Sequence, residues 1–374
     1  SQRRKREENG KDFFLRRRYV YKIHFALSPL FTASHHIISL CLVDSVASQM
    51  LTSFVDYHDK GEPVRIDTAR IYAGGDSERM LGRTLANLEA SSISLGTKAH
   101  PSQPKGLSPA GIRTQLNTSL EAMKVKSVNE FYLHQPDDEH SLLDSLKTLN
   151  ELVEEGTISA IGMSNYHASE VQRAFDLCNE YDLAKPSIYQ GLYNPLNRCV
   201  EDELLPVLRA NGCSFVAYNP LAAGLLTGTH RADGDVKEGR FKGNQNYLPR
   251  FYTPVCFSAI DSIQSACADA NVSMVEASYR WLLCHSALQA DNDDGVLIGA
   301  SSMQQLEENL SCCARAKDEQ TLPQPVLKAF EDAWKIISND STSKPFPYWR
   351  SYSADMPSKE MLDPGAAYNA AKAK

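Results

Sequence analysis

An alternation of strands and helices runs through most of this chain of 374 residues and constrains its fold more than any other feature. Short apolar segments rich in β-branched residues recur roughly every 25–35 residues, and each is followed by a helical pattern. We predict strands at 64–69, 93–99, 130–134, 160–164, 187–191, 214–218 and 296–299. Helices are expected near 77–89, 108–124, 140–155, 168–181, 201–211, 258–269, 274–286, 302–316 and 324–338. Nearly continuous apolar strands are typical of a parallel sheet buried on both faces, which indicates the α/β class.

Two architectures produce this alternation, a doubly wound sheet and a closed barrel. The sequence has no GxGxxG turn between a strand and a helix, which a doubly wound dinucleotide domain would carry. Polar residues also follow the ends of several different strands, and a barrel collects such ends into one mouth. We therefore predict a (β/α)8 TIM barrel. Only seven strands are clear, so the first strand is poorly defined and must lie before Asp44, for example within Ile37–Leu42.

The two ends of the chain differ from the repeat. Residues 1–18 carry eight Lys or Arg against three acidic residues, which favours a solvated tail over a nuclear-import signal. We treat 1–43 as a basic and apolar extension, either a divergent first strand or an artefact of the gene model. The barrel is placed at 44–350 and begins with an amphipathic helix that Asp44 would cap. Residues 351–374 are predicted to form a flexible tail.

Composition excludes several classes of protein. The net charge of −7 disfavours a general nucleic-acid binder. No apolar run reaches the roughly 18–20 residues that a membrane span needs. The nine cysteines form no CxxC pair, and we expect reduced thiols in a cytoplasmic protein. No His/Asp pair with ligand spacing ends the strands, so no metal site is predicted.

Four titratable residues lie at or just after the ends of successive strands: Asp67, Tyr72, Lys98 and His134. A free tyrosine has a pKa of about 10 and is a weak proton donor at neutral pH, but a neighbouring ammonium lowers that pKa. A carboxylate would hold the lysine in place, and the histidine would orient a carbonyl group or join a proton relay. Each residue alone also fits a surface or structural role; the set predicts a proton donor with its tuning groups.

Several short motifs occur in a set order, at 66–69, 72, 77–78, 81–82, 96–98, 132–137, 161–166, 189–194 and 217–228. With these motifs the sequence resembles the aldo-keto reductase superfamily over about residues 60–350. It is most similar to the branch that includes the aflatoxin-aldehyde and succinic-semialdehyde reductases. The resemblance implies that Asp67, Tyr72, Lys98 and His134 form a catalytic tetrad. NADPH would give a hydride to the carbonyl carbon, and Tyr72 would give the proton to the oxygen.

The resemblance also implies a cofactor site. Ser164, Asn165 and Gln190 would hydrogen-bond the nicotinamide carboxamide, since an amide needs both donors and acceptors. Tyr218 would stack on the nicotinamide ring, unless it is simply a buried barrel aromatic. Backbone around the pyrophosphate would come from Asn219, Leu221, Gly224, Leu226 and Gly228, and the adenosine end from Ser301, Gln305, Glu308 and Asn309. Many family members carry Lys and Arg at the places of Ala300 and Gln305, but the similar branch shows the same substitutions, so NADPH is retained.

Substrate contacts are expected near the C-terminal motif Tyr348–Arg350. In the similar branch such an arginine is thought to receive a substrate carboxylate, so Arg350 is a candidate, with a surface role as the alternative. Arg240 is a second candidate cation. The substrate would be a small aldehyde, a dialdehyde, a semialdehyde or a ketone. A cofactor-binding regulatory subunit and an inactive reductase are the alternative functions on the same barrel, and a homodimer is expected from the related branch.

Overall fold

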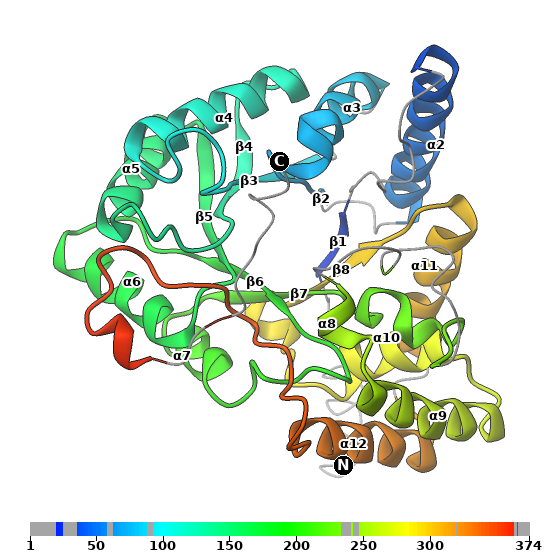
Figure 1. Ribbon diagram of the computed structural model, residues 1–374. Coiled ribbons are helices and arrows are strands. Elements are labelled where there is room, and N and C mark those ends of the chain that lie inside the picture. The colour runs from blue at the N-terminus through cyan, green and yellow to red at the C-terminus, as the bar shows by residue number, and fades with distance from the viewer. Residues whose placement is uncertain are drawn as a thin grey trace, which may run out of the picture.

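Eight parallel strands close into a barrel in the order in which they occur along the chain, β1 to β8. In this computed structural model, residues 20–24, 36–57, 63–87, 93–232, 241, 247–318, 321–362 and 365 are described. β1 pairs with β2 on one side and with β8 on the other, which closes the ring. Helices surround the ring on the outside (Figure 1). The predicted (β/α)8 architecture is confirmed.

The elements lie close to their expected places. The strands are β1 (Val20–His24), β2 (Val64–Asp67), β3 (Ile93–Ala99), β4 (Val128–Leu133), β5 (Ile158–Ser164), β6 (Ile188–Leu192), β7 (Ser214–Tyr218) and β8 (Gly295–Gly299). The α-helices are α2 (His36–Tyr57), α3 (Asp76–Thr84), α4 (Pro109–Met123), α5 (Leu142–Glu154), α6 (Ala168–Glu180), α7 (Leu204–Ala210), α8 (Leu248–Phe251), α9 (Pro254–Asp269), α10 (Met274–Cys284), α11 (Met303–Asp318) and α12 (Gln324–Ser338). Short 3₁₀ segments are η1 (Tyr72–Gly75), η2 (Leu85–Asn87), η4 (Ala222–Thr227), η5 (Ala290–Asn292) and η6 (Lys359–Met361).

The sequence determines several helix ends directly. Ser108 caps α4 by accepting a hydrogen bond from the backbone N–H of Gly111, and Pro109 occupies the first helical position. α5 ends at Glu154, and Gly156 then adopts a left-handed backbone with φ of +70°. A residue with a side chain would be strained in that conformation, which is why glycine stops the helix there.

The N-terminal part of the barrel differs from the sequence-based expectation. The first strand is Val20–His24, whereas Ile37–Leu42 lies inside the helix α2, so the strand expected there is wrong. The barrel therefore begins before residue 44, which corrects the boundary placed there. Asp44 does not cap a helix, because it lies within α2. Its carboxylate accepts two hydrogen bonds from Arg83 of α3, at 2.6 and 2.9 Å.

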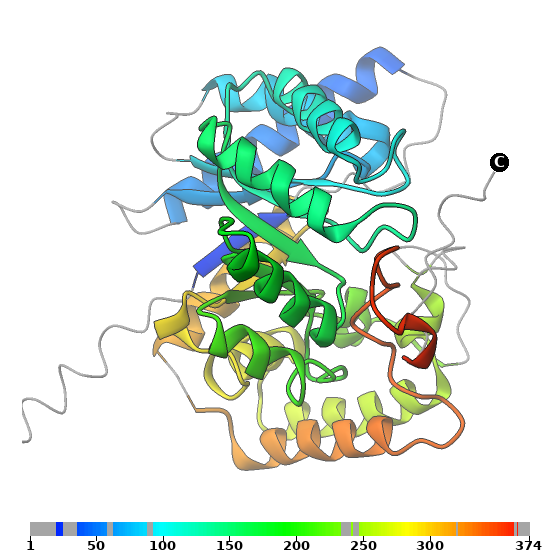
Figure 2. The same ribbon diagram turned by 90° about the vertical axis from the view of Figure 1, so that its left-hand side faces the viewer.

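Two apolar regions stabilise the barrel. The larger one lies between the strands and the surrounding helices, and α9 packs beside α12 at one end of the molecule (Figures 1 and 2). The smaller one fills the interior of the ring with Tyr132, Ile188, Val216 and Leu297. Gly162 leaves room for the Tyr132 ring, since a Cβ there would lie 2.2 Å from Cδ1 of that ring. Within the described part of the chain, no helix combines the length and apolarity needed to cross a membrane.

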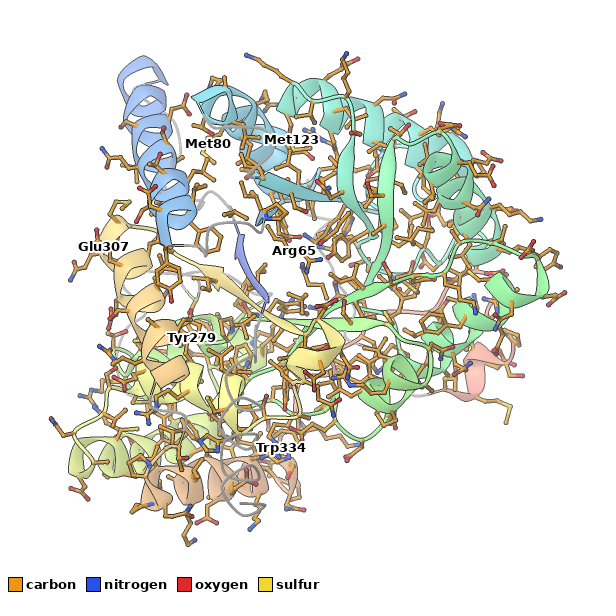
Figure 3. All side chains as sticks on the ribbon, turned by 180° about the vertical axis from the view of Figure 1, so that it is seen from behind. Arg65, Met80, Met123, Tyr279, Glu307 and Trp334 are labelled. Atoms are coloured by element: carbon orange, nitrogen blue, oxygen red, sulfur yellow. The ribbon has the colours of Figure 1, made fainter. Side chains whose placement is uncertain are left out.

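Charged residues line the barrel interior on either side of the Tyr132 ring. Toward the N-terminal ends of the strands, Nε of Arg65 lies 3.5 Å from Oε1 of Glu130. Figure 3 shows Arg65 inside the ring of strands. Tyr132 donates its hydroxyl proton to Oε2 of Glu130 at 2.5 Å, and Nζ of Lys98 lies 5.4 Å from the centre of the same ring. The polar interior therefore continues from the base of the barrel to the mouth.

Candidate active site

Lys98 and Asp67 form a fully buried ion pair at the mouth of the barrel. Nζ of Lys98 donates to Oδ2 of Asp67 at 2.5 Å and to the backbone oxygen of Thr68 at 2.8 Å. The side chains are 0% and 1% exposed, respectively. The second carboxylate oxygen, Oδ1 of Asp67, accepts a hydrogen bond from Nε2 of Gln190 at 3.0 Å. A charge removed from water in this way is retained only when such partners satisfy it.

Opposing effects act on the proton of Lys98. Burial lowers the pKa of its ammonium, because a charged group loses its hydration in the protein interior. The negative charge of Asp67 opposes that effect most strongly, followed by the charges of Glu130 and Glu78. Three carboxylates thus favour the charged form of Lys98, which burial disfavours.

The aromatic ring of Tyr72 lies over this pair. Nζ of Lys98 is 5.4 Å from the centre of the Tyr72 ring. The ring also meets the imidazole of His134 edge to face, with centroids 5.7 Å apart and planes at 85°. All four residues that the sequence analysis singled out, from β2, η1, β3 and the end of β4, are therefore brought together at one mouth.

A second histidine, which the sequence analysis missed, lies beside His134. His100 follows β3, and its ring meets that of His134 edge to face at 5.1 Å. Burial lowers the pKa of His100 to about 4, so the ring is neutral at physiological pH. Its Nδ1 accepts a hydrogen bond from the backbone N–H of Ser102 at 3.0 Å. The position two residues after Lys98 was the only sequence signal for this side chain.

Residues proposed for the nicotinamide contact each other next to the tetrad. Nδ2 of Asn165 donates to the backbone oxygen of His134 at 2.8 Å and to Oγ of Ser164 at 2.9 Å. Oδ1 of Asn165 accepts from the hydroxyl of Tyr218 at 2.9 Å. Asn165 has a left-handed backbone with φ of +63°, a conformation that asparagine tolerates better than most residues. The ends of β5 and β7 are thereby joined to that of β4.

The loop after β7 has a backbone shape of its own. Asn219, Ala222, Ala223 and Gly224 all have positive φ, from +48° to +108°. The backbone oxygen of Asn219 accepts a hydrogen bond from Nδ2 of Asn194 at 3.0 Å. Leu226 is 0% exposed and packs in the main core, and its backbone N–H donates to the backbone oxygen of Leu221 at 3.2 Å. Leu221 is partly buried against the same core, and Gly228 ends the segment with φ of +74°.

At the start of α11, the proposed adenosine residues divide into two groups. Ser301 donates its backbone N–H and its hydroxyl to Oε1 of Gln305, both at 2.8 Å, and both residues are exposed. Glu308 is exposed as well. Asn309 is buried, and its Nδ2 donates to the backbone oxygen of Gly299 at 3.1 Å, which ties the helix to the end of β8.

Residues 346–356, which we call the C-terminal strap, cross the mouth beside α6 (Figure 1). The backbone N–H of Arg350 donates to the backbone oxygen of Asn165 at 3.0 Å, so the strap touches the proposed cofactor site. The guanidinium of Arg350 lies 4.9 Å from the centre of the Phe346 ring, and that of Arg250 lies 4.8 Å from it. Arg250 was missed in the sequence, because nothing in its local pattern separates it from a surface cation. Arg240 lies outside the described residues.

The strap is fastened through two carboxylates. Glu170 of α6 accepts the backbone N–H of Ser353, at 3.0 and 3.3 Å to its two oxygens. Asp355 accepts the backbone N–H of Leu142 at 2.9 Å and pairs with Arg173 at 2.7 Å. The chain beyond residue 350 is therefore bound to α5 and α6 as far as Asp355, and the boundary placed at 350 is too early.

Glu170 should make the stability of the fold depend on pH. Burial raises its pKa to about 7 from 4.5, and the hydrogen bonds from Ser353 only partly oppose this. The folded state thus binds this proton more tightly than the unfolded state, so the stabilisation is complete below pH 4.5 and is lost as the pH rises toward 7. The free energy of unfolding in urea should be measured at pH 4.5 and at pH 7. Between these two values it should fall less in Glu170→Gln than in the wild type, by up to about 3 kcal/mol.

Glu121→Gln, at an exposed position on α4, is the matched control and should follow the wild type. If Glu170→Gln and the wild type lose stability in parallel as the pH rises, the carboxyl is not protonated in the fold.

The sequence of this chain is similar to those of known proteins. The family model described as the Aldo/keto reductase family matches residues 44–324. Aflatoxin B1 aldehyde reductase member 2 of Rattus norvegicus is 39% identical over 287 residues, covering 74% of this chain and 77% of the relative. Human Aldo-keto reductase family 7 member A3 is 38% identical over 287 residues, with coverage of 74% and 86%. An aldo-keto reductase of Pseudocercospora fijiensis is 36% identical over 281 residues, with coverage of 73% and 93%.

Proposed function

The chain belongs to the aldo/keto reductase family, and from that premise we propose that it reduces aldehydes with NADPH and uses Tyr72 as the proton donor. As a member of the family, it is an oxidoreductase that acts on carbonyl groups. The proposed role of Tyr72 is supported by the buried Lys98–Asp67 pair beneath its ring. His134 lies at the edge of the same ring.

Each residue of the proposed tetrad has one role in the reaction. The hydroxyl of Tyr72 donates its proton to the carbonyl oxygen of the substrate. The ammonium of Lys98 favours the negative charge that develops on the phenol as the proton leaves, and Asp67 holds the ammonium in place. The carbonyl oxygen would lie between Tyr72 and His134, and His134 stabilises the negative charge that develops on it. NADPH, when bound, supplies the hydride.

The residues at the mouth fit a nicotinamide cofactor. Ser164 and Asn165 are hydrogen-bonded to each other, and Gln190 donates to Asp67. Together they present hydroxyl and amide groups, the mixture that a carboxamide requires. Tyr218 is half-buried, which leaves part of its ring open to a stacking partner. The left-handed backbone at 222–224 allows close approach of a pyrophosphate, and exposed Ser301 and Gln305 would face the adenosine end.

Cofactor choice is tested by titrating the full chain with NADPH and with NADH while following nucleotide fluorescence. We expect saturable binding of both and tighter binding of NADPH. Tighter binding of NADH would contradict NADPH as the cofactor. The turnover assay would still test whether the protein reduces aldehydes.

Arg350 is proposed to receive the carboxylate of an acidic aldehyde. A charge-assisted pair of this kind contributes about 1.5–3 kcal/mol. We therefore expect Arg350→Met to raise KM about 10–100-fold for 2-carboxybenzaldehyde and succinic semialdehyde, and to leave KM for benzaldehyde unchanged. Steady-state assays with the three substrates measure this. Arg113→Met, on the exposed face of α4, is the control. An equal rise of KM for benzaldehyde would mean that Arg350 only holds the strap.

We place the enzyme in the cytoplasm and expect a homodimer. The eight cysteines from Cys178 to Cys313 are free thiols, which suits a reducing compartment. The dimer stays a prediction, to be checked by the mass of the purified full chain in solution.

A further inference from the structure

The loop that carries Tyr72 has three successive residues with a left-handed backbone. Ala73, Gly74 and Gly75 all have left-handed φ, of +49°, +62° and +92°. The backbone hydrogen bonds of the loop are those of single turns: Tyr72 donates to Ala69 at 3.0 Å, Gly74 to Ile71 at 3.3 Å, and Asp76 to Ala73. A strained and irregular segment of this kind persists only when its surroundings determine its conformation. A proton donor on such a loop needs an external support.

A buried polar cluster beside the loop supplies that support. The guanidinium of Arg70 donates to Oε2 of Glu78, and the hydroxyl of Thr97 donates to Oε1 of the same carboxylate at 2.7 Å. Glu78 and Thr97 are 0% exposed and Arg70 is 7% exposed. We call these three residues the loop clamp. A buried charge pair adds little to stability against an apolar replacement, so a positional role explains it better than stability does.

The clamp joins both ends of the loop to the strand that bears Lys98. Arg70 precedes Tyr72, Glu78 follows it on α3, and Thr97 lies next to Lys98 in β3. Side chains alternate along a strand, so Thr97 points toward α3 while Lys98 points into the barrel. In addition, the backbone N–H of Arg70 donates to the backbone oxygen of Lys98 at 3.2 Å.

The glycine at position 75 shows how tightly the clamp fits. A Cβ at Gly75 would lie 1.4 Å from Nη2 of Arg70, so the guanidinium occupies the space directly beside the loop backbone. Only a residue without a side chain allows that approach. The left-handed turn and the arginine therefore determine each other's position.

From this geometry we infer that Arg70, Glu78 and Thr97 are positioning residues that hold Tyr72 over Lys98. The inference rests on the proposed role of Tyr72 as proton donor. The three side chains bond to one another, and in this inference they act through Tyr72 and not on the substrate or the cofactor. It acts by keeping the phenol at the distance from the ammonium, 5.4 Å from ring centre to Nζ, at which the charge helps the proton to leave.

Thr97 offers the cleanest test, because single changes at Arg70 or Glu78 would leave a buried charge without its partner. Thr97→Val removes the hydroxyl and keeps the shape, whereas Thr97→Ser keeps the hydroxyl. We expect Thr97→Val to lower kcat about 10–100-fold, with KM and NADPH binding within roughly twofold of the wild type. Thr97→Ser should restore kcat. Thr114→Val, the same change at an exposed position on α4, is the control and should be neutral.

A second readout does not depend on turnover. The ultraviolet difference between each protein and its Tyr72→Phe counterpart reports the phenolate of Tyr72 during a pH titration. In Thr97→Val this signal should appear at higher pH than in the otherwise unchanged chain, because the phenol has moved from the ammonium. An unchanged titration and unchanged kcat would overturn the inference. If the wild type fails to reduce any aldehyde but the titration still shifts, the clamp stands and the proposed reaction fails.

Discussion

Replacing Tyr72 by Phe is expected to lower kcat about 10²–10⁴-fold for every aldehyde that the enzyme accepts. The change removes only the hydroxyl, so the ring keeps its edge-to-face contact with His134 and its place over Lys98. Binding of NADPH should therefore be retained. The measurement is kcat from NADPH consumption, together with a fluorescence titration of the same preparation.

Tyr181→Phe is a matched control, because this tyrosine is 43% exposed at the end of α6. It should behave as the wild type. If Tyr72→Phe kept more than about a tenth of the wild-type kcat, the proton would come from another group, since general acid catalysis contributes more than that.

The second large effect is expected for Lys98→Met, which should damage both stability and catalysis. Without the ammonium, the Asp67 carboxylate stays buried and loses the charged partner that compensates it. Removing one member of a buried pair costs about 3–5 kcal/mol, so the denaturant midpoint should fall markedly. The rate should fall at least about 10²-fold, because the phenol loses the charge that favours release of its proton.

A double substitution separates the two effects. Lys98→Met with Asp67→Asn removes both charges, so the stability should largely return while the activity does not. Recovery of activity together with stability would mean that Lys98 serves only the fold. A single variant that unfolds no more easily than the wild type would contradict the description of the pair as buried and coupled.

Most of the barrel could be predicted because parallel strands buried on both faces appear as continuous apolar runs. The seven strands from β2 to β8 were expected within a few residues of where they lie. The first strand was not, since Val20–His24 is short and follows a basic segment, whereas Ile37–Leu42 is more apolar but helical. A short apolar run carries no period that distinguishes a strand from part of a helix.

The grouping of Asp67, Tyr72, Lys98 and His134 at one mouth was predictable for a different reason. Each of its members stands at or just after a strand end, and barrel closure brings those ends together. Contacts between side chains that are distant in sequence could not be predicted in this way. The pairing of Thr97 with Glu78 and the shared contact of Arg250 and Arg350 with Phe346 depend on tertiary packing. Packing also assigns Leu226 to the core and Asn309 to the end of β8.

The most direct test of the account is turnover by the unmodified full chain. NADPH absorbance would be followed with 2-carboxybenzaldehyde, succinic semialdehyde and benzaldehyde, in the same preparation that has been shown to bind NADPH. We expect consumption of NADPH that depends on the aldehyde and forms the corresponding alcohol. Tight NADPH binding without turnover of any of the three would contradict it, and would favour a cofactor-binding regulatory protein on the same barrel.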